Sequence, residues 1–139
     1  MKLRAFEPAD IAAVRALWAT CEGLGDGPGD SEAGITRFLE RNPGLSQLAL
    51  EDGAIVGAVL CGHDGRRGFV YRLGVASTHR RQGIARTLVE RCLERLKTEG
   101  LERTMLFVLA DNAEARGFWE SVSGRWRETL VLYSIDLGA

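Results

Sequence analysis

The sequence predicts an α+β domain with a mixed, mostly antiparallel sheet, and three observations support this. Its 139 residues amount to a single domain, over residues 1–139, that can bury a core without disulfides or metals. Short strand patterns and amphipathic helix patterns alternate along the chain. The strand–helix–strand order of residues 69–110 requires a right-handed crossover, which makes one pair of strands parallel.

Alternation and turn residues define the first elements. Polar and apolar side chains alternate over residues 2–6, as in a short strand, and Asp10 stands where the cap of a helix over residues 11–22 is expected. Four glycines and a proline in residues 23–29 predict a mobile surface connection. The alternative function for this connection is a flexible lip over a substrate cleft.

A helix and a hairpin are predicted next. The helix begins at Asp30 or Ser31 and ends near residue 42. Residues 46–50 and 54–61 form two strands around a glycine-containing turn. Because the second strand is almost wholly apolar, we expect helices to cover both faces of the sheet there.

The second half predicts five more elements. Residues 69–75 form a strand, and residues 81–99 form the longest helix, with one apolar stripe at steps of three and four. A buried strand over residues 103–110, a short helix over 112–122 and a tail strand over 129–135 follow. The tail strand would offer an edge to a second copy, so a homodimer is a possible partner arrangement.

The net charge and the number of cysteines limit the classes of partner and the cellular location that we expect. Eighteen Lys+Arg against nineteen Asp+Glu give a net charge of −1, which argues against nucleic acid and anionic membranes as partners. No apolar run approaches the ~20 residues of a membrane span, and the first residues do not resemble a signal peptide. The three cysteines are scattered and the two histidines unpaired, so we expect a cytoplasmic protein with reduced thiols and no metal site.

Chemistry is concentrated where a buried strand ends and the long helix begins. The N-terminus of a helix offers unpaired N–H groups and a partial positive charge, which favour an anion. Gly83 and Ala85 remove bulk there, and Arg80, Arg81 and Arg86 add positive charge suited to phosphate oxygens. The alternative is a plain helix start with solvated arginines and close helix–strand packing.

The same segment resembles a family signature. The run Arg80-Arg81-Gln82-Gly83-Ile84-Ala85 matches the [Q/R]-x-x-G-x-[G/A] motif of the GCN5-related N-acetyltransferase (GNAT) superfamily. Asn112 followed by Phe118-Trp119-Glu120 resembles a later stretch of that family. The runs Leu17-Trp18…Cys21, 62–68 and 71–75 are most similar to its short YpeA-type bacterial acetyltransferases.

The resemblance implies a sheet whose two parallel strands splay apart, and acetyl-CoA as cosubstrate held near that gap. The resemblance also implies that the acetyl group passes directly from acetyl-CoA to a primary amine of a small molecule, peptide or protein. The positions implied to bind the cofactor are Leu73, Gly74, Val75, Arg80, Arg81, Gln82, Gly83, Ile84, Ala85, Arg86, Asn112 and Phe118.

The catalytic positions depart from the family pattern. Trp119 stands where relatives often carry a proton-donating tyrosine, and Phe107 and Phe69 stand where others carry a glutamate base. Tyr71 and Tyr133 are therefore the candidate catalytic residues. The departures also leave open an alternative, a catalytically weak acyl-CoA-binding or regulatory module.

Overall fold

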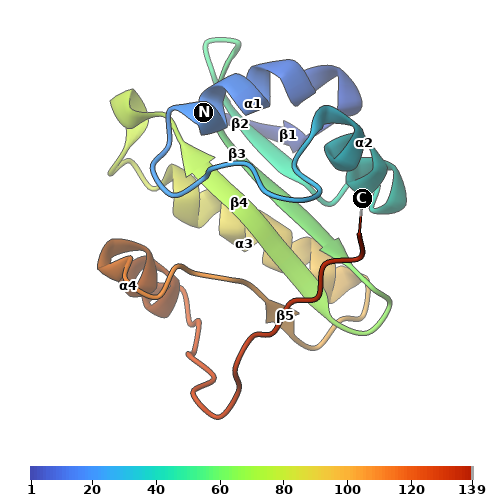
Figure 1. Cartoon of the computed structure of the whole chain (residues 1–139). Coiled ribbons are helices and arrows are strands. Elements are labelled where there is room, and N and C mark those ends of the chain that lie inside the picture. Colours follow the sequence, from blue (N-terminus) through green and yellow to red (C-terminus); the bar gives the residue numbers. More distant parts are fainter. Residues whose placement is uncertain (139) are drawn as a thin grey trace. The chain divides into compact units, whose positions relative to one another are not determined.

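The computed structural model describes residues 1–138, and Figure 1 shows the arrangement of its elements. In chain order they are β1 (Lys2–Ala5), η1 (Pro8–Asp10), α1 (Ile11–Ala19), α2 (Glu32–Arg41), β2 (Gln47–Glu51), β3 (Ala54–His63), β4 (Gly68–Val75), η2 (Ser77–His79), α3 (Ile84–Thr98), β5 (Thr104–Met105) and α4 (Ala113–Ser121). The chain divides into two compact units, Met1–Phe107 and the segment from Val108 onward, and each is described by itself.

The first unit is built on a five-stranded sheet in the order β1-β2-β3-β4-β5. The first three pairings are antiparallel, and β4 pairs with β5 in parallel. This arrangement confirms the predicted α+β class and its mixed, mostly antiparallel sheet with one parallel pair.

Helices cover both faces of β3, because its side chains alternate between them. A Cβ at Gly57 would lie 3.0 Å from the Ile84 and Leu88 side chains of α3. Three residues later, Leu60 belongs to the buried core that contains Trp18 of α1. Figure 1 shows α3 on one side of the sheet and α1 with α2 on the other, as the apolar run predicted.

The prediction of a long buried strand over residues 103–110 is wrong. Only Thr104 and Met105 pair with β4, opposite Gly68 and Phe69. The side chain of Phe107 is 58% exposed. A strand needs a hydrogen-bonding neighbour along its length, and β5 leaves its neighbour after two residues. The parallel pairing of β4 and β5 therefore ends at Met105.

Several predicted boundaries also shift. Helix α1 ends at Ala19 instead of residue 22. Helix α2 begins at Glu32, because Ser31 is its cap and accepts a hydrogen bond from Gly34 N at 3.1 Å. Asp10 precedes α1 but makes no cap bond, since its carboxylate pairs with Arg4.

Over its described residues, 108–138, the second unit contains one helix, α4. The predicted tail strand over residues 129–135 is wrong, because residues 131–138 form no helix or strand. Tyr133 and Ile135 are more than 80% exposed. Their alternation fits a strand, but they have no strand partner within residues 1–138. None of the helices described over residues 1–138 is long and apolar enough to cross a bilayer.

Candidate active site

The turn between β4 and α3 holds the predicted phosphate site, and its backbone explains where the helix begins. Arg81 and Gly83 have positive φ values of 61° and 79°. Neither conformation continues a right-handed helix, so α3 begins at Ile84 instead of the predicted Arg81. Alternation of left- and right-handed residues turns successive N–H groups toward one side of the chain.

The amides at this helix start are available to a ligand. Within residues 1–138, the N–H groups of Gly83, Ile84 and Ala85 donate to no protein acceptor. Further along the helix, the amide of Thr87 donates to Gly83 O at 3.0 Å. A Cβ at Gly83 would meet nothing within 4 Å, so the space beside these amides is open.

Positive charge surrounds the same amides. Arg80, Arg81 and Arg86 are exposed. Arg86 lies 3.9 Å from Glu90 one turn along α3, whereas Arg80 and Arg81 form no ion pair within residues 1–138. Unpaired amides, the positive end of a helix and two unpaired guanidinium groups fit a phosphate or pyrophosphate.

The carboxyl end of β4 has a free edge next to this turn. Beyond Phe69 no described strand pairs with the β5 side of β4. The pairing with β3 shifts between Ala58 and Leu60, so that Arg72 and Leu73 together oppose Val59. Such a bulge bends the strand and leaves backbone groups unpaired. Leu73, Gly74 and Val75 thus lie at an edge to which an extended ligand can add.

Tyr71 of β4 packs against three aromatic rings, of which only Phe69 is on the same strand. Its ring stacks on Phe69 at 5.7 Å, lies 5.8 Å from Phe107, and packs edge-on against Phe38 at 6.1 Å. Burial raises the pKa of the Tyr71 hydroxyl, with a smaller contribution from Asp64. The phenol is therefore protonated at neutral pH and suits a proton donor, not a base.

Three of the predicted site residues lie in the second unit. The Asn112 carboxamide oxygen accepts a hydrogen bond from Ala115 N at 3.0 Å and caps α4. Phe118 packs edge-on against Trp119, with centroids 5.1 Å apart. Tyr133 is 85% exposed. Their relation to the turn after β4 stays a prediction.

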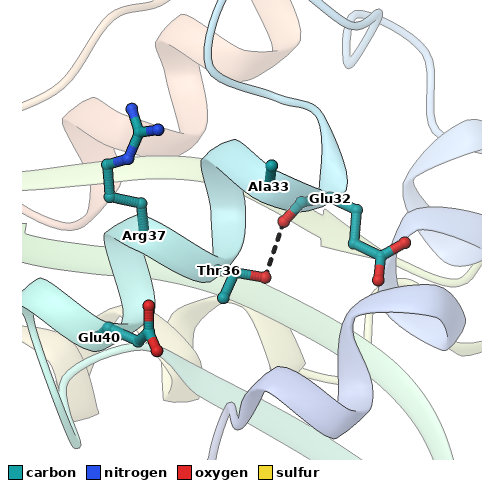
Figure 2. A pocket seen from close by; sticks show the side chains of 5 residues that line it. All are labelled: Glu32, Ala33, Thr36, Arg37 and Glu40. Atoms are coloured by element: carbon teal, nitrogen blue, oxygen red, sulfur yellow. Dashed lines mark hydrogen bonds between the residues drawn. The ribbon is translucent and has the colours of Figure 1, made fainter.

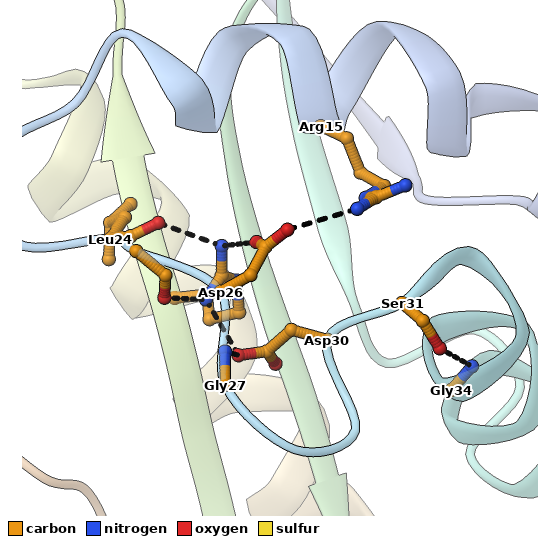
Figure 3. Close-up of polar contacts among 9 residues, drawn as sticks. Arg15, Leu24, Asp26, Gly27, Asp30, Ser31 and Gly34 are labelled. Atoms are coloured by element: carbon orange, nitrogen blue, oxygen red, sulfur yellow. Dashed lines mark hydrogen bonds and ion pairs between the residues drawn. The ribbon is translucent and has the colours of Figure 1, made fainter.

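Sequence reasoning missed Arg72, which stands in the middle of β4. Its side chain is only 11% exposed, and its guanidinium pairs with Asp26 and Asp30 of the loop before α2. The signal was an arginine within the apolar run of a buried strand, because a buried charge requires partners. Figure 3 shows the loop side of this network, with Asp26 also reaching Arg15.

A surface hollow of the first unit lies on the exposed face of α2 between Glu32, Ala33, Thr36, Arg37 and Glu40 (Figure 2). It includes none of the predicted site residues. Residues 1–138 contain no group of three or more His, Cys, Asp or Glu side chains that would hold a metal ion.

Comparison with known proteins identifies the family of the chain. Residues 11–124 match the family model described as the acetyltransferase (GNAT) family. An acetyltransferase of Yersinia enterocolitica is 35% identical over 132 residues, which cover 95% of this chain and 93% of the relative. One of Pectobacterium atrosepticum is 38% identical over 122 residues, covering 88% and 86%.

A solved structure shares the fold. The aminoglycoside 6'-N-acetyltransferase of Acinetobacter haemolyticus matches with a TM-score of 0.77 at 19% identity, covering 99% of this chain and 100% of that one. The chain belongs to the GNAT family of acetyltransferases. It is an N-acetyltransferase that moves an acetyl group to an amine, and its fold implies acetyl-CoA as cosubstrate.

Proposed function

We propose that acetyl-CoA binds where β4 ends and α3 begins. Its pyrophosphate accepts hydrogen bonds from the main-chain N–H groups of residues 81–85, which include those of Gln82 and Ile84. The side chains of Arg80 and Arg86 add positive charge. The observation that carries the proposal is the unpaired state of the Gly83, Ile84 and Ala85 amides. Helix starts with free amides bind phosphate groups in many proteins.

The pantetheine arm lies along the free edge of β4. The backbone groups of Leu73, Gly74 and Val75 pair with its amides as an added strand would. Asn112 donates to the arm through its side-chain nitrogen, since its oxygen is already engaged in capping α4. Phe118 provides an apolar contact. The roles of Asn112 and Phe118 follow the family resemblance.

The reaction is the direct attack of a neutral primary amine on the thioester. When bound, the cosubstrate supplies an activated acetyl group and a thiolate leaving group. A free alkylamine has a pKa near 10.4, so only about one molecule in 2,500 is neutral at pH 7, and the site must favour that form. Tyr71 serves as the proton donor, because burial keeps its hydroxyl protonated. Tyr133 is the second candidate.

The acceptor is a small-molecule amine or a peptide or protein amine. The structural neighbour that acetylates aminoglycosides makes a polyamine the first class to test. We also propose a cytoplasmic location and a homodimer that covers the exposed apolar side chains of residues 130–137. Sedimentation equilibrium tests the dimer, and a monomer at micromolar concentration would contradict it.

Calorimetry with CoA tests the binding site through a matched pair of variants. Gly83→Glu places bulk and negative charge beside the free amides, and we expect CoA affinity to fall by at least about tenfold, or ~1.4 kcal/mol. Gly53→Glu is the control, because Gly53 has a similar φ of 81° and equally open space but lies in the β2–β3 turn. Equal loss in both variants, or no CoA binding by the native protein, would contradict the site.

Thiol release from acetyl-CoA tests the proton donor. Tyr71→Phe removes the hydroxyl and keeps the ring that packs on Phe69, so CoA affinity should not change. We expect kcat to fall about 100-fold, a usual contribution of general acid catalysis. Tyr133→Phe is the comparison variant. If it reduces kcat instead, the proton donor is Tyr133.

A further inference from the structure

Arg72 occupies an unusual position for an arginine. It lies in the bulge of β4 with a φ of 56°, between an aromatic residue, Tyr71, and an aliphatic one, Leu73. Its side chain is 11% exposed, and its Nε atom is buried without a partner within residues 1–138. A cation so placed must be held by specific contacts.

The hydrogen bonds of the Arg72 guanidinium all go to the loop that joins α1 to α2. Nη1 donates to Asp30 Oδ2 at 3.0 Å and to Gly25 O at 3.2 Å. Nη2 donates to Leu24 O at 3.1 Å and to Asp26 Oδ1 at 3.3 Å. The guanidinium plane also lies 4.6 Å from the centroid of the Trp18 ring. One side chain therefore gathers two carbonyls and two carboxylates of a glycine-rich segment.

No other residue does this for the loop. Within residues 1–138, the hydrogen bonds between residues 23–30 and β4 all come from Arg72. Arg15 binds Asp26 at 3.0 Å, but it belongs to α1 and is 38% exposed. A segment with four glycines loses much conformational freedom when it is fixed, so its position depends on these bonds.

The place where Arg72 holds the loop is the end of β4 that the proposed function assigns to acetyl-CoA. A Cβ at Gly74 would lie 3.0 Å from Leu24 and 3.1 Å from the sulfur of Cys21. The loop is thus in contact with the strand positions predicted to bind the pantetheine arm. Holding an acceptor near a thioester increases its effective concentration only if the surrounding wall is fixed.

We propose that Arg72 is a positioning residue, which fixes the 23–30 loop against the carboxyl end of β4 and so shapes the acceptor side of the acetyl-transfer site. This inference rests on the proposed function, which places the thioester at that end of the strand. The carboxylates of Asp26 and Asp30 then serve the loop and are neutralised by Arg15 and Arg72, so they do not form an open acidic patch for a cationic amine.

The chain contains its own probe of the loop. Cys21 is half-buried at the start of this segment, and its thiol lies 3.7 Å from Val75 O. The other cysteines, Cys61 and Cys92, are fully buried between β3 and α3. The rate at which iodoacetamide alkylates Cys21, followed by peptide mass spectrometry, therefore reports how often the loop leaves β4.

Three variants make the test specific. Arg72→Met keeps much of the side-chain volume and removes every donor, and we expect Cys21 to be alkylated at least about tenfold faster than in the native protein. Arg72→Lys retains the charge without the forked geometry and should give an intermediate rate. Arg15→Met is the control, because it also removes a bond to Asp26 but leaves the ties to β4, and its rate should stay within about twofold.

A kinetic split separates positioning from general damage. Thiol release from acetyl-CoA is measured with spermidine, lysine methyl ester and an alanyl peptide. We expect Arg72→Met to raise the KM of the amine at least about tenfold, while CoA affinity by calorimetry stays within about threefold of native. Arg72→Lys should recover part of the loss. Far-UV circular dichroism and thermal melting establish that each variant is folded.

The outcomes distinguish this inference from the proposed function. Equal Cys21 alkylation in native protein and Arg72→Met overturns the role of Arg72, whatever the calorimetry gives. An equal loss of CoA affinity and amine affinity in Arg72→Met also overturns it. Absence of CoA binding by the native protein contradicts the proposed function instead. If none of the three amines is acetylated, the alkylation rates decide.

Discussion

Two glycine-containing segments contact or flank the end of β4, and they differ in whether their polar groups have hydrogen-bond partners. In the loop over residues 23–30, carbonyls and carboxylates are engaged by Arg72 and Arg15. At the start of α3, the amides of Gly83, Ile84 and Ala85 donate to no described acceptor. The polar groups of the first segment are paired within the protein, whereas the amides of the second remain open to solvent or to the proposed ligand.

The difference teaches that glycine content by itself does not identify a ligand site. The 23–30 loop has four glycines, whereas the turn after β4 has only Gly83. What distinguishes the turn is that the Gly83, Ile84 and Ala85 amides have no acceptor within residues 1–138. Unpaired donors tolerate solvent or bind an anion, and here the helix dipole and two unpaired arginines favour the anion.

We expect the largest change in stability when the 23–30 loop, whose polar groups are paired, is displaced from α2. A Cβ at Gly34 in α2 would overlap the Gly29 carbonyl, so Gly34→Ala forces the loop and the helix apart. We expect the free energy of unfolding to fall by about 1–3 kcal/mol, measured by urea denaturation. CoA affinity should change little, since the turn after β4 is untouched.

Gly117→Ala is the matched control for this substitution. Gly117 is also a helix interior glycine, in α4, but its Cβ would meet nothing within 4 Å. We expect a gain of about 0.5–1 kcal/mol from helix propensity. Destabilisation of equal size in both variants would mean that the Gly29 contact does not restrain the loop.

A smaller change, in CoA affinity, is expected when a charge is removed from the turn between β4 and α3. Arg81→Gln removes one exposed charge, and we expect CoA affinity to fall about threefold to tenfold at 0.05 M salt, with a smaller difference at 0.5 M salt. Arg66→Gln removes an exposed charge from the β3–β4 turn and is the control. An equal loss in both would indicate a long-range effect of net charge instead of a local phosphate contact. Stability should not change in either variant.

The smallest expected effect is the contribution of one ion pair, between Arg4 and Asp10, to the free energy of unfolding. Arg4 and Asp10 form a two-bond ion pair at 2.7 and 2.8 Å, and the Arg4 hydrogen bond lowers the pKa of Asp10. Because the folded-state pKa is lowered, this stabilisation is present above the unfolded value near 3.9 and is lost as pH falls through the folded value. Asp10→Asn should therefore cost up to about 1 kcal/mol at pH 7.

Denaturation at several pH values checks this prediction. The difference between native protein and Asp10→Asn should shrink as pH falls below about 4, because the carboxyl of the unfolded chain takes up its proton there while that of the folded protein, with its lowered pKa, does so only at lower pH. A difference that is constant between pH 7 and pH 2 would show that Asp10 stabilises η1 and α1 without its charge. Its bond from Glu7 N at 2.9 Å is the contact that would then matter.

Much of the fold follows from patterns local to each segment. The apolar stripe of α3 and the hairpin of β2 and β3 were predicted within a few residues, since helix and turn signals depend on neighbours in sequence. The strand over 103–110 and the tail strand were not, although their residues favour strands. Whether such residues form a strand depends on a partner edge, which belongs to another part of the chain.

The sequence by itself determined the class of the sheet and the place of the turn before α3, and it narrowed the start of α2 to Asp30 or Ser31, because each depends on residues close along the chain. Only the tertiary structure decided that β5 ends after two residues and that Arg72 holds the 23–30 loop. Arg72 and Asp30 are 42 residues apart, and a contact over that distance exists only once the chain has folded. The physical reason is that local periodicity fixes which face a residue occupies, whereas its partner is fixed by packing.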